Sequence, residues 1–520
     1  MTTYWLSLIV LAGAAPPAAV ALKTTVAPLG KGNYQVGAPV AVSRDGNHVL
    51  YGVQHTTADG DQWGVAVDGV EGKKTYDQLG QLLFGADGKH WAFSGKRGDH
   101  WTAVIDGVEG KTYDAVDRLH FSADGSRVGY VAELPGQEAA VIDGVVGKFY
   151  GNVNGLVFSA DGKHSAYIAA RGTALNNHID DAVVLDGVEQ KPFPQIVPAS
   201  VHLSPDGKRL ALATASPSGQ VRVVVDGAPS KNGYDEVKQA PNDARVLRFS
   251  PDGKHLAFEV RRGEKWMLVV DDQEGPAYDD VKADSIRCGR DGNHWSYVAL
   301  KGQKYVAVVD GKEGKECDEA TGVRFSADGG RFAYVAKEGD KQAVVTNEGE
   351  GKAYTGVGAL CLSPDGKHVA YRALRDDSTA AVVLDGKEQK AYLTIDDSSV
   401  RLSPDGKRLA YFGMEKGDPN TGGITRWFVL DGAETTAYGL DAPDGRSVTF
   451  GPDGKHAAFT VFKITAAVPA SVVVVDGVES KGYGSPLADG RPVFDGPDKL
   501  HLLGTDGDKI VRVEVEVGGK

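Results

Sequence analysis

The sequence has few of the features that define disulfide-stabilised, membrane-spanning or nucleic-acid-binding proteins. Only three of its 520 residues are cysteine, namely Cys288, Cys317 and Cys361, which is too few for a disulfide framework. No segment approaches the ~20 consecutive apolar residues that a transmembrane helix needs, so we expect no membrane span. Acidic residues outnumber basic ones, 70 to 57, and the formal charge of -13 disfavours binding to nucleic acid.

Sequence motifs for catalysis or metal binding are missing as well. The chain contains no G-x-S-x-G nucleophile elbow, its cysteines lack the spacing of a zinc site, and no loop has the alternating oxygen ligands of an EF-hand. The sequence therefore predicts neither a cofactor nor a metal site. It favours a non-enzymatic protein, although catalysis is retained below as an alternative.

Glycine is abundant instead, with 68 residues, and much of it belongs to a repeated motif. The segment FSADGKHSAY at 158–167 recurs along the whole chain with modest variation, and a degenerate last copy, VFDGPDKLHLL, stands at 493–503. These Asp-Gly turns have a mean spacing of about 41 residues, the period of a four-stranded propeller blade. Their aspartates are Asp45, Asp87, Asp124, Asp161, Asp206, Asp252, Asp291, Asp328, Asp365, Asp405 and Asp453.

A second Asp-Gly motif follows most of the first ones, as in AVIDGVEGKTY around Asp106 and VVLDGKEQKAY around Asp385. Each repeat therefore contains two hairpins and four strands, a to d, of which VRFS, HLAYVA, AVVVDG and GKAYDAV are typical. We expect the Asp and Ser of the first turn to hydrogen-bond the local backbone while its Gly takes a positive φ. Histidine or arginine follows this turn in all eleven regular copies, which indicates a surface role for that position rather than catalysis.

The repeat predicts an all-β fold, a β-propeller of about twelve four-stranded blades. A single blade cannot cover both of its apolar faces, whereas radial packing against neighbouring blades covers them. Because twelve blades exceed the usual 4 to 8 per propeller, the sequence favours two six-bladed rings in tandem, residues 22–282 (blades 1–6) and 283–520 (blades 7–12). One large ring is the alternative, since residues 32–36 (GNYQV) resemble a stray strand d that could complete the last blade.

The amino terminus has the pattern of a secretory signal peptide. Residues 5–15 form a short apolar run, and Ala19-Val20-Ala21 is a small-residue cleavage pattern, so residues 1–21 are assigned to the signal peptide. The protein is then expected in the periplasm or outside the cell.

The segments FSPDGKHLAF, LSPDGKRLAY and LSPDGKRLAL resemble the repeats of TolB-type and WD-like β-propellers of bacteria. The resemblance covers nearly the entire mature chain. It implies a propeller that serves as a binding platform or as an accessory domain of a hydrolase, and it does not name a ligand. The Trp-Asp dipeptide of the WD-repeat family is absent, because Asp-Gly stands at that place.

One strand position, which we call the inner-wall position, is enriched in cationic side chains. It lies four residues before the first-turn aspartate on strand a, the innermost strand of a propeller blade. The candidate ligand-binding residues at this position are Arg248, Arg287, Arg324, Arg401, His120 and His202. Arginine presents a planar fork that suits a carboxylate or phosphate, so an anion-binding channel mouth is one interpretation. Pairing of each arginine with a carboxylate of an adjacent blade is the other.

These observations favour an exported, non-enzymatic scaffold that binds a protein, peptide or glycan of the envelope or the extracellular space. The alternative is a propeller hydrolase or lyase that acts on a glycan or lactone. Such an enzyme needs an acid/base pair in one channel, and the inner strands offer no inward carboxylate apart from Asp495.

Overall fold

The computed structural model describes residues 21–29, 39–57, 60–170, 181–193, 195–197, 199–238, 247–417, 423–464, 466, 469–487 and 490–518. The expected signal peptide, apart from Ala21, and the strand expected at 32–36 lie outside these residues. No helix in the described part of the chain is long and apolar enough to cross a membrane.

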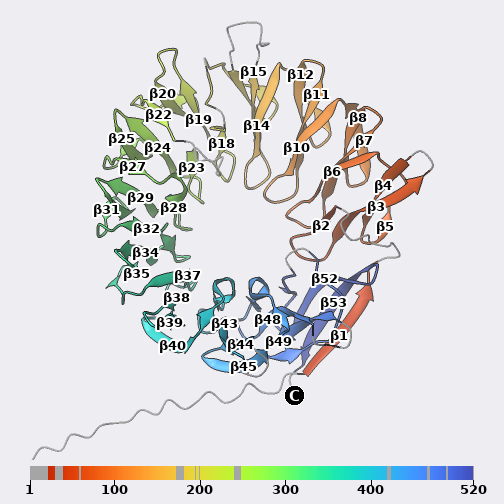
Figure 1. Cartoon of the computed structure of the whole chain (residues 1–520). Helices are drawn as coiled ribbons and strands as arrows, with labels where there is room; N and C mark the ends of the chain where they lie inside the picture. Colours follow the sequence, from red (N-terminus) through yellow and green to blue (C-terminus); the bar gives the residue numbers. More distant parts are fainter. Residues whose placement is uncertain are drawn as a thin grey trace, which may run out of the picture.

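The sheets form one closed ring of twelve blades, each with four strand positions (Figure 1). The all-β propeller of twelve four-stranded blades is confirmed, but the expected division into two six-bladed rings is corrected to the alternative, a single large ring. The reason lies in the packing at two junctions. Residues of blade 6 such as Leu268 share an apolar cluster with Trp295 and Tyr297 of blade 7, and Tyr51 of blade 1 packs against Leu503 and Ile510 of blade 12.

The first five blades follow the chain without interruption. Their strands are β2 (Val40–Val42), β3 (Val49–Thr57), β4 (Gly60–Val67) and β5 (Val70–Glu71) in blade 1; β6 (Gln78–Phe84), β7 (Trp91–Arg97), β8 (His100–Ile105) and β9 (Val108–Tyr113) in blade 2; β10 (Ala115–Phe121), β11 (Val128–Leu134), β12 (Gln137–Ile142) and β13 (Val145–Val146) in blade 3; β14 (Asn152–Phe158), β15 (Ser165–Ala170), β16 (Asp181–Leu185) and β17 (Val188–Glu189) in blade 4; and β18 (His202–Leu203), β19 (Leu210–Ala215), β20 (Val221–Val225) and β21 (Ala228–Pro229) in blade 5.

In blades 6 to 8 the inner strand is divided into two short pieces that pair with the same second strand. Their elements are β22 (Glu236–Val237), β23 (Leu247–Phe249), β24 (Leu256–Arg262), β25 (Lys265–Val270) and β26 (Gln273–Glu274) in blade 6; β27 (Asp280–Val281), the 3-10 turn η1 (Ala283–Ser285), β28 (Arg287–Cys288), β29 (Trp295–Lys301), β30 (Lys304–Val309) and β31 (Lys312–Glu313) in blade 7; and β32 (Glu319–Ala320), β33 (Arg324–Phe325), β34 (Phe332–Glu338), β35 (Lys341–Thr346) and β36 (Gly349–Glu350) in blade 8.

The last four blades include the one that closes the ring. Their elements are β37 (Gly356–Leu362), β38 (Val369–Leu374), β39 (Ala380–Leu384) and β40 (Lys387–Tyr392) in blade 9; β41 (Thr394–Ile395), η2 (Asp397–Ser399), β42 (Arg401–Leu402), β43 (Leu409–Lys416), β44 (Ile424–Leu430) and β45 (Ala433–Tyr438) in blade 10; β46 (Ala442–Pro443), η3 (Gly445–Ser447), β47 (Thr449–Phe450), β48 (Ala457–Lys463), β49 (Ala470–Val475) and β50 (Val478–Glu479) in blade 11; and β51 (Val493–Phe494), β52 (Lys499–Asp506), β53 (Lys509–Gly518) and β1 (Ala21–Pro28) in blade 12.

The outer strand d is shorter than expected from the sequence. The segment expected as one strand, GKAYDAV in its typical form, is divided between two blades. In blade 2, β9 ends at Tyr113, and Ala115 already begins the inner strand β10 of blade 3. The aspartate after the tyrosine therefore marks the crossing from the rim of one blade to the inner wall of the next.

The two Asp-Gly motifs form different turns. In the first, Gly125 has φ 80° and the hydroxyl of Ser122 donates to Asp124 over 2.5 Å, while the backbone N–H of Arg127 donates to Ser122 over 3.0 Å. This confirms the expected turn role of Ser, Asp and Gly. In the second, both central residues have positive φ, 47° at Asp106 and 80° at Gly107, which is the two-residue type I′ hairpin that Asp-Gly favours.

Packing between blades combines an apolar core with a ring of polar contacts near the rim. Small residues of the second strand, such as Ala257 and Ala410, are fully buried against the next blade. Farther out, a tyrosine hydroxyl at the end of one blade donates to a glutamate of the following blade. Such pairs are Tyr76–Glu109 (2.7 Å), Tyr150–Glu189 (3.1 Å), Tyr234–Glu274 (3.1 Å), Tyr278–Glu313 (3.1 Å), Tyr354–Glu388 (3.0 Å) and Tyr392–Glu434 (2.9 Å).

The amino-terminal strand closes the ring. β1 pairs antiparallel with β53 over its whole length, from Ala21 opposite Gly518 to Pro28 opposite Val511. Its half-buried side chains Leu22 and Val26 pack on the core of blade 12. A terminal strand thus completes the opposite terminal blade, as expected, and it is formed by Ala21–Pro28.

Candidate functional site

The inner-wall position is one structural position in the folded ring. Arg287, Arg324 and Arg401 stand opposite Ser296, Ala333 and Ala410 of the second strand of their blades, in the same register. Arg248 pairs with Ala257 in the same way. The four arginines therefore lie on the innermost strands of blades 6, 7, 8 and 10.

Two of these arginines are anchored to backbone carbonyls just before them. Nη1 of Arg287 donates to the carbonyl oxygens of Asp284 (2.6 Å) and Ile286 (2.8 Å), and Nη1 of Arg401 donates to that of Val400 (2.9 Å). These bonds fix part of each guanidinium group, and they arise because the chain turns sharply through η1 and η2 immediately before the strand.

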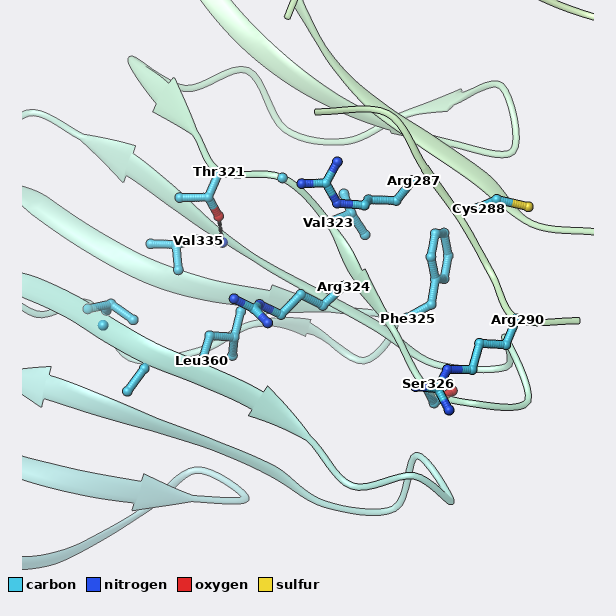
Figure 2. A pocket seen from close by; sticks show the side chains of 14 residues that line it. Arg287, Cys288, Arg290, Thr321, Val323, Arg324, Phe325, Ser326, Val335 and Leu360 are labelled. Carbon is cyan, nitrogen blue, oxygen red and sulfur yellow. Dashed lines mark hydrogen bonds between the residues drawn. The ribbon is translucent and has the colours of Figure 1, made fainter. Parts of the chain in front are cut away.

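A pocket of about 580 Å³ opens at the inner wall between blades 7, 8 and 9. Figure 2 shows Arg287 and Arg324, from adjacent blades, projecting their guanidinium groups along one side of it. Phe325 and Arg290 lie toward the other end of the pocket, where Arg290 extends beside Ser326. All three arginines are exposed. The pocket therefore has two lining residues that were predicted from the sequence, Arg287 and Arg324, and one that was not, Arg290.

The lining of this pocket is cationic and apolar. Apart from its three arginines it is formed by Cys288, Thr321, Gly322, Val323, Phe325, Ser326, Val335, Val357, Gly358, Ala359 and Leu360, and none of the described residues that line it is acidic. The hydroxyl oxygen of Thr321 accepts from the Val335 N–H over 3.0 Å, and Ser326 donates to Asp328 in its own turn over 2.6 Å. The arginines are therefore the groups of this pocket that can hold an anion.

Cationic side chains continue along the inner wall beyond the pocket. Burial raises the pKa of Cys361 to about 11, and the nearby charges of Arg401 and Arg324 oppose that rise. Burial also lowers the pKa of Arg401, and the like charge of Arg491 lowers it further. Arg491 precedes the inner strand of blade 12, and it was missed because it stands outside the repeated position.

Arg248 has a different environment at the junction of blades 6 and 7. The carboxyl group of Glu259, on the second strand β24, is only 4% exposed. Burial raises the pKa of Glu259 to about 7, while the charges of Lys238 and Arg248 lower it. Arg248 thus lies near a buried acid of its own blade and is not among the residues that line the pocket.

The two predicted histidines lie on other blades. His120 in blade 3 uses Nδ1 to bond the carbonyl oxygen of Arg118 over 2.7 Å, and its ring packs near Phe158. His202 in blade 5 is half-buried on β18. The structure therefore does not place either histidine beside the arginine pocket.

The histidines and arginines that follow the first turn have a structural partner. His294 bonds Asp310 through Nδ1 over 2.7 Å, and Asp310 also accepts the backbone N–H of Trp295 over 2.9 Å. Arg127 bonds Asp143 in the same way over 2.7 Å. The second-turn aspartate thus ties the two hairpins of a blade together, which explains why this position exchanges between His and Arg.

Asp495, the one inward carboxylate suggested by the sequence, contacts the fully buried His501 at 2.8 Å. His501 also contacts the carbonyl oxygen of Asp45 in blade 1 at 3.1 Å, so this group links the first and last blades. The three cysteines are free thiols, and within the described ranges no cluster of His, Cys, Asp or Glu could hold a metal ion.

No family model matches the chain, and no curated protein matches it in sequence. Solved structures with a similar fold include a eukaryotic initiation factor (13% identity, TM-score 0.32, 67% of this chain and 97% of that chain). The β-propeller domain of the Trilobed protease from Pyrococcus furiosus is 14% identical with a TM-score of 0.26, covering 54% and 97%. The tricorn protease is 12% identical with a TM-score of 0.26, covering 92% and 55%. These are likenesses of fold and assign no activity.

Proposed function

We propose that the protein is a non-enzymatic binding scaffold that holds a protein, peptide or glycan ligand at the inner wall of its ring. The observation that carries this proposal is the pocket between blades 7 and 9, which Arg287, Arg290 and Arg324 line without an acidic residue among the described lining residues. Exposed guanidinium groups in a concave site are suited to bind an anionic group of a ligand.

The chemistry of the lining supports binding rather than catalysis. The pocket lining, as far as the described residues form it, contains no Asp, Glu or His that could act as a general acid or base. Its one thiol, Cys288, is a poor nucleophile because burial raises its pKa to about 12, so the reactive thiolate is scarce at neutral pH. The three arginines of the lining can bind and orient an anionic group. They stay protonated at neutral pH and therefore do not transfer protons.

The proposed location is the periplasm or the extracellular space. The support is the apolar run followed by Ala19-Val20-Ala21 near the amino terminus. Expression of the full chain in a bacterial host, followed by fractionation and mass measurement, tests this part. Recovery of the uncleaved chain from the cytoplasm alone would contradict it.

The binding function is tested by replacing three inner-wall arginines together, as R287A/R324A/R401A. We expect this variant to lose binding to anionic members of a peptide and glycan array, while R261A, an arginine paired with Glu236 on blade 6, keeps it. Unchanged binding with lowered stability would show that the arginines only support the fold. Turnover of an array member without stable capture would favour the hydrolase or lyase alternative.

A further inference from the structure

We propose that the pocket between blades 7 and 9 recognises a polypeptide segment through a carboxylate that stands next to an apolar side chain. This inference rests on the proposed binding function and specifies the ligand class of the same site. It follows from three features of the pocket, namely its cations, its apolar wall and its size.

The cationic feature is a pair of guanidinium groups from neighbouring blades. The hydrogen bonds of Arg287 Nη1 to two carbonyl oxygens hold that guanidinium at the pocket. Arg324 is exposed and, within the part of the chain that the structure describes, has no recorded hydrogen bond or ion pair. A carboxylate placed between the two would accept charge-assisted hydrogen bonds from both, which adds direction as well as charge.

The apolar feature distinguishes a peptide from a glycan. Phe325 and Val357 are half-buried at the lining, so part of each side chain can contact a ligand, whereas Val323, Val335 and Leu360 are buried in the apolar cores between blades. A sugar ring needs several hydrogen-bonding groups for its hydroxyls, yet no Asn, Gln, Asp or Glu of the described ranges lines the pocket. The hydroxyls of Thr321 and Ser326 already take part in hydrogen bonds within the protein. The wall therefore suits a hydrocarbon side chain.

The size and polarity of the pocket set how much of a ligand it holds. A volume of about 580 Å³ falls within the range of about 300–1,000 Å³ typical of sites for small ligands, so it takes a few residues and not a folded domain. Arg290 lies at the other end of the pocket from the guanidinium groups of Arg287 and Arg324 (Figure 2). A second acidic group along the peptide would therefore lie near Arg290 once the first is held by Arg287 and Arg324.

The required carboxylate has two sources in a polypeptide, the free chain terminus and an Asp or Glu side chain. Both present the same pair of carboxylate oxygens to the arginines. Fluorescein-labelled peptides separate them: one ends in Glu-Leu with a free carboxylate, one has the same sequence amidated, and one has both the amide terminus and Gln in place of Glu.

The test measures binding of these peptides to the full chain by fluorescence anisotropy. We expect the peptide with neither carboxylate to bind at least about tenfold more weakly than the best of the other two. R287Q/R324Q should weaken the best peptide by a similar factor, whereas R261Q on blade 6 should not change its Kd. Equal binding of all three peptides to the wild-type protein would overturn the proposal.

A variant that keeps the charges but adds a side chain at the pocket tests whether the peptide binds there. G322L adds a side chain beside the pocket, and a Cβ at Gly322 would have its nearest neighbour, Nη2 of Arg287, at 3.8 Å, so the backbone tolerates the change. We expect G322L to weaken the best peptide at an unchanged melting temperature. Full-affinity binding by G322L would place the peptide elsewhere and contradict the inference.

The same assay separates failure of this inference from failure of the proposed function. If a uronate oligosaccharide or inorganic phosphate binds in a manner that depends on Arg287 and Arg324 while the peptides do not, the scaffold function stands and the peptide assignment is wrong. If no anionic probe responds to R287Q/R324Q, both are wrong.

Discussion

The buried carboxyl group of Glu259 makes the stability of the ring depend on pH in a direction that can be worked out in advance. Glu259 lies on β24 between blades 6 and 7, is 4% exposed, and its Oε2 has no hydrogen-bond partner within the described structure. Burial raises its pKa to about 7. Lys238 and Arg248 lower the pKa, and Asp280 and Asp284 raise it.

The sign follows from proton binding in the two states. An unfolded Glu has a pKa near 4.5, so between about pH 4.5 and pH 7 the folded chain holds a proton that the unfolded chain has released. The stabilisation is fully present below the unfolded value and is lost as pH rises toward 7. A difference of about two to three pKa units corresponds to about 3 kcal/mol.

Glu259→Gln removes this titration while keeping the shape of the protonated side chain. We expect the free energy of unfolding of E259Q, measured by urea titration with tryptophan fluorescence, to be close to that of wild type at pH 5. At pH 8 we expect E259Q to be more stable by up to about 3 kcal/mol.

Glu236→Gln is the matched control, because Glu236 is exposed on the same blade and pairs with Arg261 at the surface. The difference between E236Q and wild type should stay within about 0.5 kcal/mol over the same pH range. If E259Q differs from wild type by the same amount at pH 5 and pH 8, or is the less stable protein at pH 8, the reasoning on Glu259 is refuted.

Three further predictions concern the contacts between blades and the closed ring. Tyr278→Phe should lower the free energy of unfolding by about 1–2 kcal/mol because the hydroxyl donates a hydrogen bond to Glu313. Tyr113→Phe is the control and should leave the free energy of unfolding unchanged, since the Tyr113 hydroxyl has no partner in the described structure. Equal losses for the two variants in denaturant titrations would contradict a stabilising role of the Tyr278–Glu313 pair. Val26→Asp should destabilise the protein by about 2–3 kcal/mol because Val26 packs on the core of blade 12. Lys23→Ala, at an exposed position of the same strand, is the control. Unchanged thermal melting of V26D would show that β1 does not close the ring. Cys361 should react slowly with iodoacetamide at pH 8 in the folded protein and quickly in urea, because burial raises its pKa to about 11; mass spectrometry showing rapid folded-state labelling would contradict this.

The local features of the fold could be predicted from the sequence because they depend on residues close together in the chain. An Asp-Gly pair such as Asp310-Gly311 sets its own hairpin through positive φ values, whatever the rest of the protein does. The number of rings could not be predicted in this way. It depends on the small rotation between adjacent blades. Many contacts together determine that rotation, among them those of the apolar cluster that contains Leu268 and Trp295.

The ends of the strands were also beyond the sequence pattern. GKAYDAV was expected as one strand, yet in the corresponding segment of blade 2 the chain crosses to blade 3 after Tyr113 because the tyrosine belongs to the rim and the following residues to the inner wall. The closing strand was expected at 32–36, whereas Ala21–Pro28 fills that place. Its alternation of half-buried Leu22, Thr24 and Val26 begins directly after the expected cleavage site, and it was assigned to no strand from the sequence.

The candidate site could be predicted only in part. The inner-wall position was found because Arg287 and Arg324 break an apolar pattern at a fixed distance from a turn. Arg290 was missed because it stands inside the turn, where a polar residue is ordinary, and only the fold brings it to the other end of the same pocket. The junction residue Glu259 could have been found by comparing repeats, since the same position is Val298 in blade 7 and Val335 in blade 8.

The contrast between repeated and varied positions argues for where specificity resides in this ring. Turn aspartates such as Asp310 recur because each blade needs the same bond between its two hairpins, and a change there would cost stability without altering the inner wall. The blade does not require a particular residue at the inner-wall position. It is Cys361 in blade 9 and Thr449 in blade 11, and both strands still form. Arginine at this position in blades 7 and 8 is therefore not required by the blade architecture. The physical reason to expect a ligand in the pocket between blades 7 and 9 is that two such arginines, from adjacent blades, line it, and none of its described lining residues is acidic.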